Sequence, residues 1–133
     1  MRMIAAAVLG GVLLAACAVE DMPEPDEGRA LFVENCAMCH GASGRGDGEI
    51  AAGLRPRPAD LTTIAARNGG AFPRAQVLSK IDGYARSDPQ QDMPEFGLLL
   101  RGDTVPVDVG DGQFTPVPRP LAALMTYLES IQR

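Results

Sequence analysis

Residues 35–48 read NCAMCHGASGRGDG, and the interpretation of the whole chain depends on them. The stretch contains two of the three cysteines, Cys36 and Cys39, and the only histidine, His40. Two thiols and an imidazole therefore stand together in a Cys-x-x-Cys-His pattern. These are side chains that bind metals or attach to metal-containing groups, so the pattern indicates a cofactor site.

Three kinds of site contain cysteines at this spacing. A structural zinc ion needs four protein ligands, and the third cysteine, Cys17, is accounted for by the leader described next. A thioredoxin-like thiol pair is expected beside a β-α-β unit, whereas a helical pattern precedes this motif and a glycine-rich loop follows it. The pattern therefore predicts one covalent haem c, with Cys36 and Cys39 attached to the porphyrin and His40 bound to iron.

Residues 1–16, MRMIAAAVLGGVLLAA, have the composition of an export signal. One positive charge, at Arg2, precedes an apolar run and then small residues, which is the order found in secretory signal peptides. The run ends in Leu14-Ala15-Ala16-Cys17, which resembles the lipobox of bacterial lipoproteins. This resemblance implies that Cys17 is acylated and anchors the protein stably on the periplasmic side of a bacterial membrane.

The chain after the leader divides into a tether and one domain. Residues 17–25 carry the lipidated cysteine and an acidic, proline-containing stretch, so an extended tether is expected over 18–25. Residues 26–133 are long enough for one small domain. Asp26 is expected to cap a first helix that leads into the Cys-x-x-Cys-His motif.

Further helix signals lie downstream. Asp60 and Pro73 begin two helical segments that are ended by glycines, and Val77, Leu78 and Ile81 form the apolar face of the second. The pattern of the last segment, residues 119–133, predicts a helix with one apolar face, which contains Leu121, Leu124, Leu128 and Ile131.

Residues 104–117, TVPVDVGDGQFTPV, alternate around a Gly-Asp-Gly turn and predict a small β-hairpin. Pro106 and Pro116 have no backbone N–H group, so the hairpin is expected to be an edge feature outside the core. Covering a haem edge and docking a partner are both roles open to it.

A single histidine leaves the second face of a haem iron to another residue type. His/Met ligation is the familiar pairing in electron-carrying cytochromes c. Four of the six methionines lie in the leader, the tether or the motif itself: Met1, Met3, Met22 and Met38. Met125 lies in a regular helix, where core packing is expected. Met93 lies in the loop QQDMPEFG, which Pro94 stiffens, and is the predicted second ligand.

Several stretches together resemble the class I cytochrome c family. The similar segments are Gly28…Phe32…Cys36-x-x-Cys39-His40, residues 53–61 (GLRPRPADL), Met93-Pro94 and Leu124…Tyr127-Leu128. The resemblance implies an all-α fold around a single haem, with the first and last helices crossing at Gly28. The hairpin before the last helix is a departure from the family, because it is extra to the smallest members. It also implies that His40 is the proximal ligand and Met93 the distal one.

The resemblance also concerns the surroundings of His40. A proline carbonyl in this family commonly accepts the Nδ1–H of the proximal histidine, which raises the basicity of the ligand. Pro56 and Pro58 both qualify, and Pro56 is preferred. Arg55 and Arg57 either pair with the haem propionates or lie exposed in the loop.

These features predict a membrane-anchored periplasmic monohaem cytochrome c that carries single electrons between redox proteins. An iron with two protein ligands has no open site for a small-molecule substrate, so the chain is expected not to be an enzyme. The alternative is the haem c subunit of a larger membrane oxidoreductase, such as a dehydrogenase or terminal oxidase. A catalytic or gas-sensing haem, with Met93 off the iron, is a third reading. The net charge of −5 and a single lysine argue against nucleic-acid binding.

Overall fold

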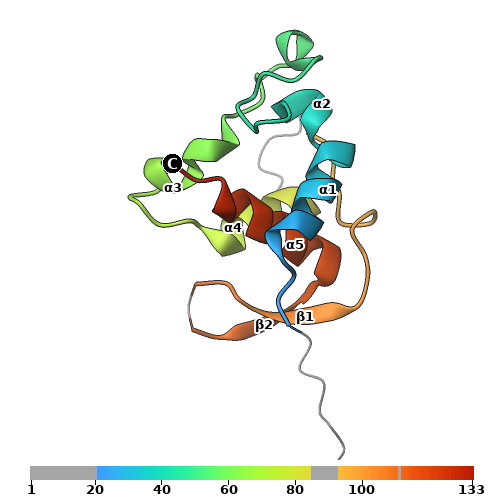
Figure 1. Ribbon diagram of the computed structural model, residues 1–133, viewed down its shortest axis with the longest axis vertical. Coiled ribbons are helices and arrows are strands. Elements are labelled where there is room, and N and C mark those ends of the chain that lie inside the picture. The colour runs from blue at the N-terminus through green and yellow to red at the C-terminus, as the bar shows by residue number, and fades with distance from the viewer. Residues whose placement is uncertain (1–20, 85–92, 111) are drawn as a thin grey trace, which may run out of the picture.

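The computed structural model describes residues 21–84, 93–110 and 112–133. The predicted leader and Cys17 lie outside these residues. In chain order the elements are α1 (Pro25–Asn35), α2 (Ala37–His40), η1 (Ala51–Gly53), η2 (Leu61–Thr63), α3 (Ile64–Arg67), α4 (Arg74–Asp82), β1 (Thr104–Asp108), β2 (Phe114–Pro118) and α5 (Arg119–Ser130). The fold is mostly helical with a small two-stranded sheet (Figure 1). None of the helices in this part of the chain is long and apolar enough to cross a bilayer.

The first and last helices, α1 and α5, cross in close contact (Figure 1). Gly28 permits this approach, because a Cβ atom at this position would lie 1.9 Å from the carbonyl oxygen of Ala123. One turn later, the rings of Phe32 and Tyr127 pack with their centroids 5.2 Å apart. The expected crossing at Gly28 is therefore confirmed.

The start of α1 differs from the expectation. The helix begins at Pro25, and its N-cap, Glu24, makes no side-chain capping bond. Proline suits the first helical position because its φ is already helical and its missing N–H has no partner there anyway. Asp26, the expected cap, lies instead in the first turn, where a carboxylate interacts favourably with the helix dipole.

The end of the expected tether contacts the domain. Pro23 is fully buried, and the Arg119 guanidinium donates to the carbonyl oxygen of Asp21 at 3.1 Å. The same guanidinium forms an ion pair with Glu27 at 2.7 Å. Residues 21–25 are thus held against α5, and the expected extended tether is wrong for these residues.

The two predicted middle helices are present. Asp60 caps η2 by accepting a hydrogen bond from the Thr62 N–H. The chain passes directly from η2 into α3. Pro73 precedes α4, whose buried residues are the predicted Val77, Leu78 and Ile81. Gly83 ends α4 with a φ of 99°, which a residue with a side chain adopts only at a cost.

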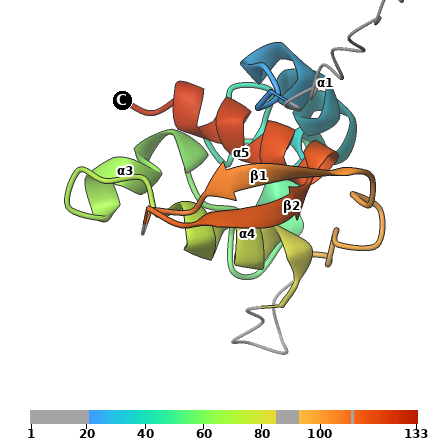
Figure 2. The same cartoon turned by 90° about the horizontal axis from the view of Figure 1, so that it is seen from below.

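The hairpin is part of the core, contrary to the expectation. Pro106 and Pro116 are cross-strand partners, and both are exposed. Strand alternation then turns Val105 and Val107 inward, where each is 0% exposed. Both strands contact α5, beside which they lie in Figure 2. The prolines lie on the outer face, so their missing N–H groups do not keep the valines out of the core.

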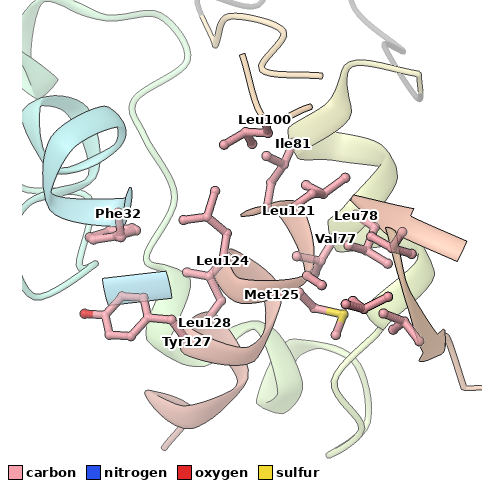
Figure 3. Close-up of a cluster of buried hydrophobic side chains, with 14 residues drawn as sticks. Phe32, Val77, Leu78, Ile81, Leu100, Leu121, Leu124, Met125, Tyr127 and Leu128 are labelled. Atoms are coloured by element: carbon pink, nitrogen blue, oxygen red, sulfur yellow. The ribbon is translucent and has the colours of Figure 1, made fainter. Parts of the chain in front are cut away.

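One buried cluster joins α1, α4, α5 and the hairpin (Figure 3). Met125 is 1% exposed and belongs to it, which confirms its expected packing role. Leu121, Leu124 and Leu128 of the predicted apolar face are also buried there. This core holds α1 rigidly, and α1 carries the Cys-x-x-Cys-His motif at its end.

Candidate functional site

The cysteine-histidine motif lies on one short helical turn. The Cys36 N–H still bonds to the Phe32 carbonyl at 2.9 Å, and α2 follows at once. The Cys36 carbonyl accepts hydrogen bonds from the N–H groups of Cys39 (3.2 Å) and His40 (2.9 Å). Residues at spacings of three and four share a helix face. The turn therefore presents both thiols and the imidazole on one side.

The glycine-rich loop folds back under this turn. The N–H groups of Gly46, Gly48 and Ile50 donate to the carbonyl oxygens of His40 (2.8 Å), Cys39 (3.2 Å) and Met38 (3.2 Å), respectively. The carbonyls at the end of a helix have no partner within it. The loop supplies these partners and fixes α2 in place.

The His40 ring is oriented by a backbone carbonyl, but not by the expected one. Nδ1 lies 3.2 Å from the carbonyl oxygen of Ala59. A carbonyl can only accept, so Nδ1 carries the proton and Nε2 is the nitrogen left for a metal. The preferred candidate, Pro56, does not make this contact, and neither does the alternative, Pro58.

Packing explains the change of acceptor. A Cβ atom at Gly46 would lie 2.3 Å from the Pro58 carbonyl oxygen, so that oxygen is directed at the glycine loop. The Leu61 N–H donates to the Gly44 carbonyl at 2.7 Å and holds the segment there. Ala59 is the residue between these two attachments. Pro56 and Pro58 still line the neighbouring cavity.

A largely apolar cavity of about 270 Å³ lies beside the motif. Cys36, Cys39 and His40 form part of its lining, and Met93 forms another part. The remaining lining residues are Phe32, Asn35, Leu54, Pro56, Arg57, Pro58, Ala59, Leu61, Ile64, Val77, Lys80, Ile81, Pro94, Phe96, Leu124 and Leu128. Met125 and the hairpin are not among them. The cavity therefore brings together Cys36, Cys39, His40 and Met93 of the predicted site.

A model of the cytochrome c family matches residues 25–104, a range that includes the motif, the Ala59 segment and Met93. The chain belongs to the cytochrome c family. Members of this family are electron-transfer proteins that carry covalently attached haem c. A search of curated proteins finds no match.

A solved structure shares the fold of this cytochrome. It is a chain of the reducing HAO-like protein complex of Kuenenia stuttgartiensis, with a TM-score of 0.56 and 20% sequence identity. The match covers 84% of this chain and 45% of that chain, so the cytochrome spans less than half the length of this neighbour. At this identity the similarity concerns the fold alone.

The donor set in this cytochrome fits haem c. Cys36 and Cys39 are both free thiols, as thioether formation requires, and the cavity surface next to them is mostly apolar, as a porphyrin requires. Among the described residues, no three His, Cys, Asp or Glu side chains are grouped to hold a metal ion by themselves. The thiols and imidazole therefore suit attachment of a haem better than a closed zinc site.

Burial controls the protonation of the motif. Burial, with a smaller contribution from the nearby Cys39, raises the pKa of the Cys36 thiol to about 11. Burial lowers the pKa of His40, and the Ala59 carbonyl opposes part of that shift. The imidazole is thus held neutral, which is the form that binds metal.

The two candidate arginines have different surroundings. Arg57 lines the cavity, as does Lys80. Arg55 is not part of the lining, and its guanidinium donates to the carbonyl oxygens of Ala52 (3.0 Å) and Leu54 (2.8 Å). Of the two arginines, Arg57 alone lines the cavity. The sequence did not identify Lys80 as a site residue. The available signal was its place in α4 next to Ile81, which lines the same cavity.

Proposed function

We propose that this protein is a monohaem electron carrier, with haem attached to Cys36 and Cys39 and its iron bound by His40 and Met93. One observation carries the proposal: two thiols, one imidazole and one thioether line the same apolar cavity. Met93 is the one described methionine in that lining. His/Met ligation fills both axial positions and favours electron transfer over substrate chemistry.

The bound haem supplies a one-electron couple, and the chain supplies its surroundings. The Ala59 carbonyl holds the proton of His40 on Nδ1 and leaves Nε2 as the ligand atom. The apolar lining, with Phe32, Leu124 and Leu128 from the crossing helices, excludes water from the site. Burial and axial sulfur are two of the means by which a protein sets a haem potential.

The ligation is tested by the weak far-red absorption band that sulfur-to-iron bonding gives in oxidised His/Met cytochromes c. The purified wild-type protein should show this band, and Met93→Leu should abolish it. Leucine keeps the side-chain volume and removes only the sulfur. Met125→Leu is the matched control and should keep the band. A wild-type protein without the band that binds carbon monoxide readily would refute the electron-carrier proposal.

Membrane attachment through Cys17 is part of the proposal and rests on the sequence, because this residue lies outside the described structure. Cys17→Ser should move the protein from the membrane fraction to the soluble periplasmic fraction. Retention of the variant in the membrane would argue against the lipid anchor. A stoichiometric companion in mild detergent extracts would instead assign the chain as a haem subunit of a larger oxidoreductase.

A further inference from the structure

Thr62 is the one polar residue that the described part of the chain buries, with 5% of its surface exposed. Its hydroxyl donates to Asp60 Oδ1 at 2.6 Å and accepts from Arg133 Nε at 2.8 Å. Arg133 also reaches Asp60 Oδ2 at 3.2 Å. Asp60, Thr62 and Arg133 thus form a closed triangle of hydrogen bonds, which we call the Asp60 clamp.

The Asp60 clamp immediately follows the residue that holds the haem-site histidine. Asp60 comes directly after Ala59, whose carbonyl accepts from His40. The Asp60 carboxylate takes the Thr62 N–H at 2.9 Å. The Asp60 carbonyl accepts from Arg67 at 2.8 Å and from the Thr63 hydroxyl at 3.3 Å. Both the side chain and the backbone of Asp60 are therefore held in place.

The residues after α5 tie this segment to the core helix. Gln132 Nε2 donates to the Leu61 carbonyl at 2.8 Å and to the Leu128 carbonyl at 2.6 Å. The Arg133 N–H donates to the Thr62 carbonyl at 3.0 Å. These bonds therefore fix the position of the Ala59 carbonyl relative to α5. Leu124 and Leu128 of α5 also line the cavity.

We infer that Asp60 is a positioning residue that fixes the Ala59 carbonyl on His40 Nδ1 and thereby sets the reduction potential of the haem. This inference rests on the proposed role of His40 as an iron ligand. Nothing in the Asp60 clamp touches the cavity, because neither Asp60, Thr62 nor Arg133 is part of its lining. The effect on the haem therefore passes through the Ala59 carbonyl.

The direction of the effect follows from the chemistry of the histidine. A hydrogen bond from Nδ1–H to a carbonyl raises the basicity of the ligand. A more basic ligand favours the oxidised, more positive iron and lowers the reduction potential. Loosening the Ala59 carbonyl should therefore raise the potential and expose the Nδ1 proton to exchange with solvent.

Asp60→Ala tests the inference in the full haem-loaded protein. The midpoint potential should rise, by at most about 59 mV, which corresponds to a tenfold change for one electron. The exchange of the His40 Nδ1–H proton with solvent, followed by NMR in the reduced protein, should become several-fold faster. A change on the order of several-fold is expected because one hydrogen bond is weakened. Loss of the Asp60 charge by itself also raises the potential, so the proton exchange is the deciding readout. A merely structural role would leave that exchange unchanged in protein that remains folded.

Two milder variants keep the test decisive if Asp60→Ala does not fold. Asp60→Asn keeps an oxygen that accepts from Thr62 and loses the charge opposite Arg133, so it should give a smaller rise. Arg133→Gln leaves both Thr62–Asp60 bonds intact and should also give a smaller rise. The control is Glu27→Gln, which removes the ion pair to Arg119 at 2.7 Å on a residue that is not part of the cavity lining.

The outcomes separate this inference from the proposed function. A wild-type far-red band, together with unchanged potential and proton exchange in Asp60→Ala and Asp60→Asn, would overturn the inference and leave the carrier intact. Equal changes in potential and in proton exchange in Glu27→Gln would also overturn it, because the effects would then follow from lost charge or stability and not from the Ala59 carbonyl. Absence of the band from the wild-type protein would count against Met93 ligation, whereas the proton-exchange difference would still report on Asp60.

Discussion

Gly28 and Ala123 are in backbone contact: a Cβ atom on Gly28 would lie 1.9 Å from the Ala123 carbonyl oxygen and 2.7 Å from the Tyr127 Cβ. The neighbours are backbone and the stem of a side chain, and neither yields easily. This contact sets how closely α1 and α5 cross, and α1 leads directly into Cys36. The spacing of the two helices thus places the motif against the cavity.

Gly28→Ala should destabilise the protein because α1 and α5 must separate to admit one methyl group. Overpacking of this kind costs about 1–3 kcal/mol. Denaturant unfolding of the haem-loaded protein measures the loss. Gly53→Ala is the control, since a Cβ atom there meets nothing within 4 Å. Equal stability of the two variants would show that the helix crossing adapts without cost.

Gly46→Ala should loosen the bond between Ala59 and His40. A Cβ atom at Gly46 would lie 2.3 Å from the Pro58 carbonyl oxygen and 3.1 Å from that of Ala59. The segment that holds His40 must therefore move away. The haem potential should rise and the Nδ1–H proton should exchange faster, as measured by redox titration and NMR.

The control for this substitution is Gly69→Ala. Gly69 has a φ of 68°, close to the 78° of Gly46, but no atom within 4 Å of its Cβ position. Both variants carry the left-handed backbone cost of roughly 1–2 kcal/mol. A potential that shifts equally in both would trace the effect to backbone strain and not to the Ala59 carbonyl.

The ion pair between Glu27 and Arg119 should make stability depend on pH. The hydrogen bond from Arg119 holds the pKa of the Glu27 carboxyl below its ordinary value. A lowered pKa contributes stability above the unfolded-state pKa and loses it as the pH falls through the folded-state pKa. Wild-type protein should therefore be more stable than Glu27→Gln at neutral pH, and the difference should disappear in acid. A difference in unfolding free energy that is independent of pH would contradict this account.

Arg57→Gln should lower the reduction potential, because Arg57 lines the cavity and its positive charge favours the reduced haem. Arg55→Gln should change the potential less, because the guanidinium of Arg55 bonds to the local carbonyls of Ala52 and Leu54. Redox titration of the two variants at one ionic strength makes the comparison. A larger shift in Arg55→Gln would reverse the assignment of the cavity arginine.

Local patterns were enough to predict the helices, whereas the crossing at Gly28 was predicted from the resemblance to the class I cytochrome c family. The apolar spacing in α4 and α5 and the cap at Asp60 depend on neighbours two to four positions away. The grouping of Met93 with the Cys-x-x-Cys-His motif was also predicted, because a proline-stiffened loop and a regular helix place their methionines differently. Met125 packs in the core accordingly.

Apart from the start of α1, the errors concern contacts between distant segments. The acceptor for His40 depends on where Gly44 and Gly46 hold residues 58–61, and no local pattern contains that information. The burial of Val105 and Val107 depends on which face of the hairpin meets α5. Pro106 and Pro116 limit the hydrogen bonding of the hairpin, but they do not determine which of its faces packs against α5.

The three bonds from the glycine loop to α2 impose a length on this segment. Gly46, Gly48 and Ile50 bond to His40, Cys39 and Met38 in reverse order, so the loop uses two residues for every helix residue that it serves. Removing one residue between Gly46 and Ile50 would shift the later donors past their acceptors and leave a carbonyl of α2 to water. Homologues and engineered variants that keep this arrangement should therefore tolerate substitutions at the non-glycine residues of 45–50 far better than single-residue deletions.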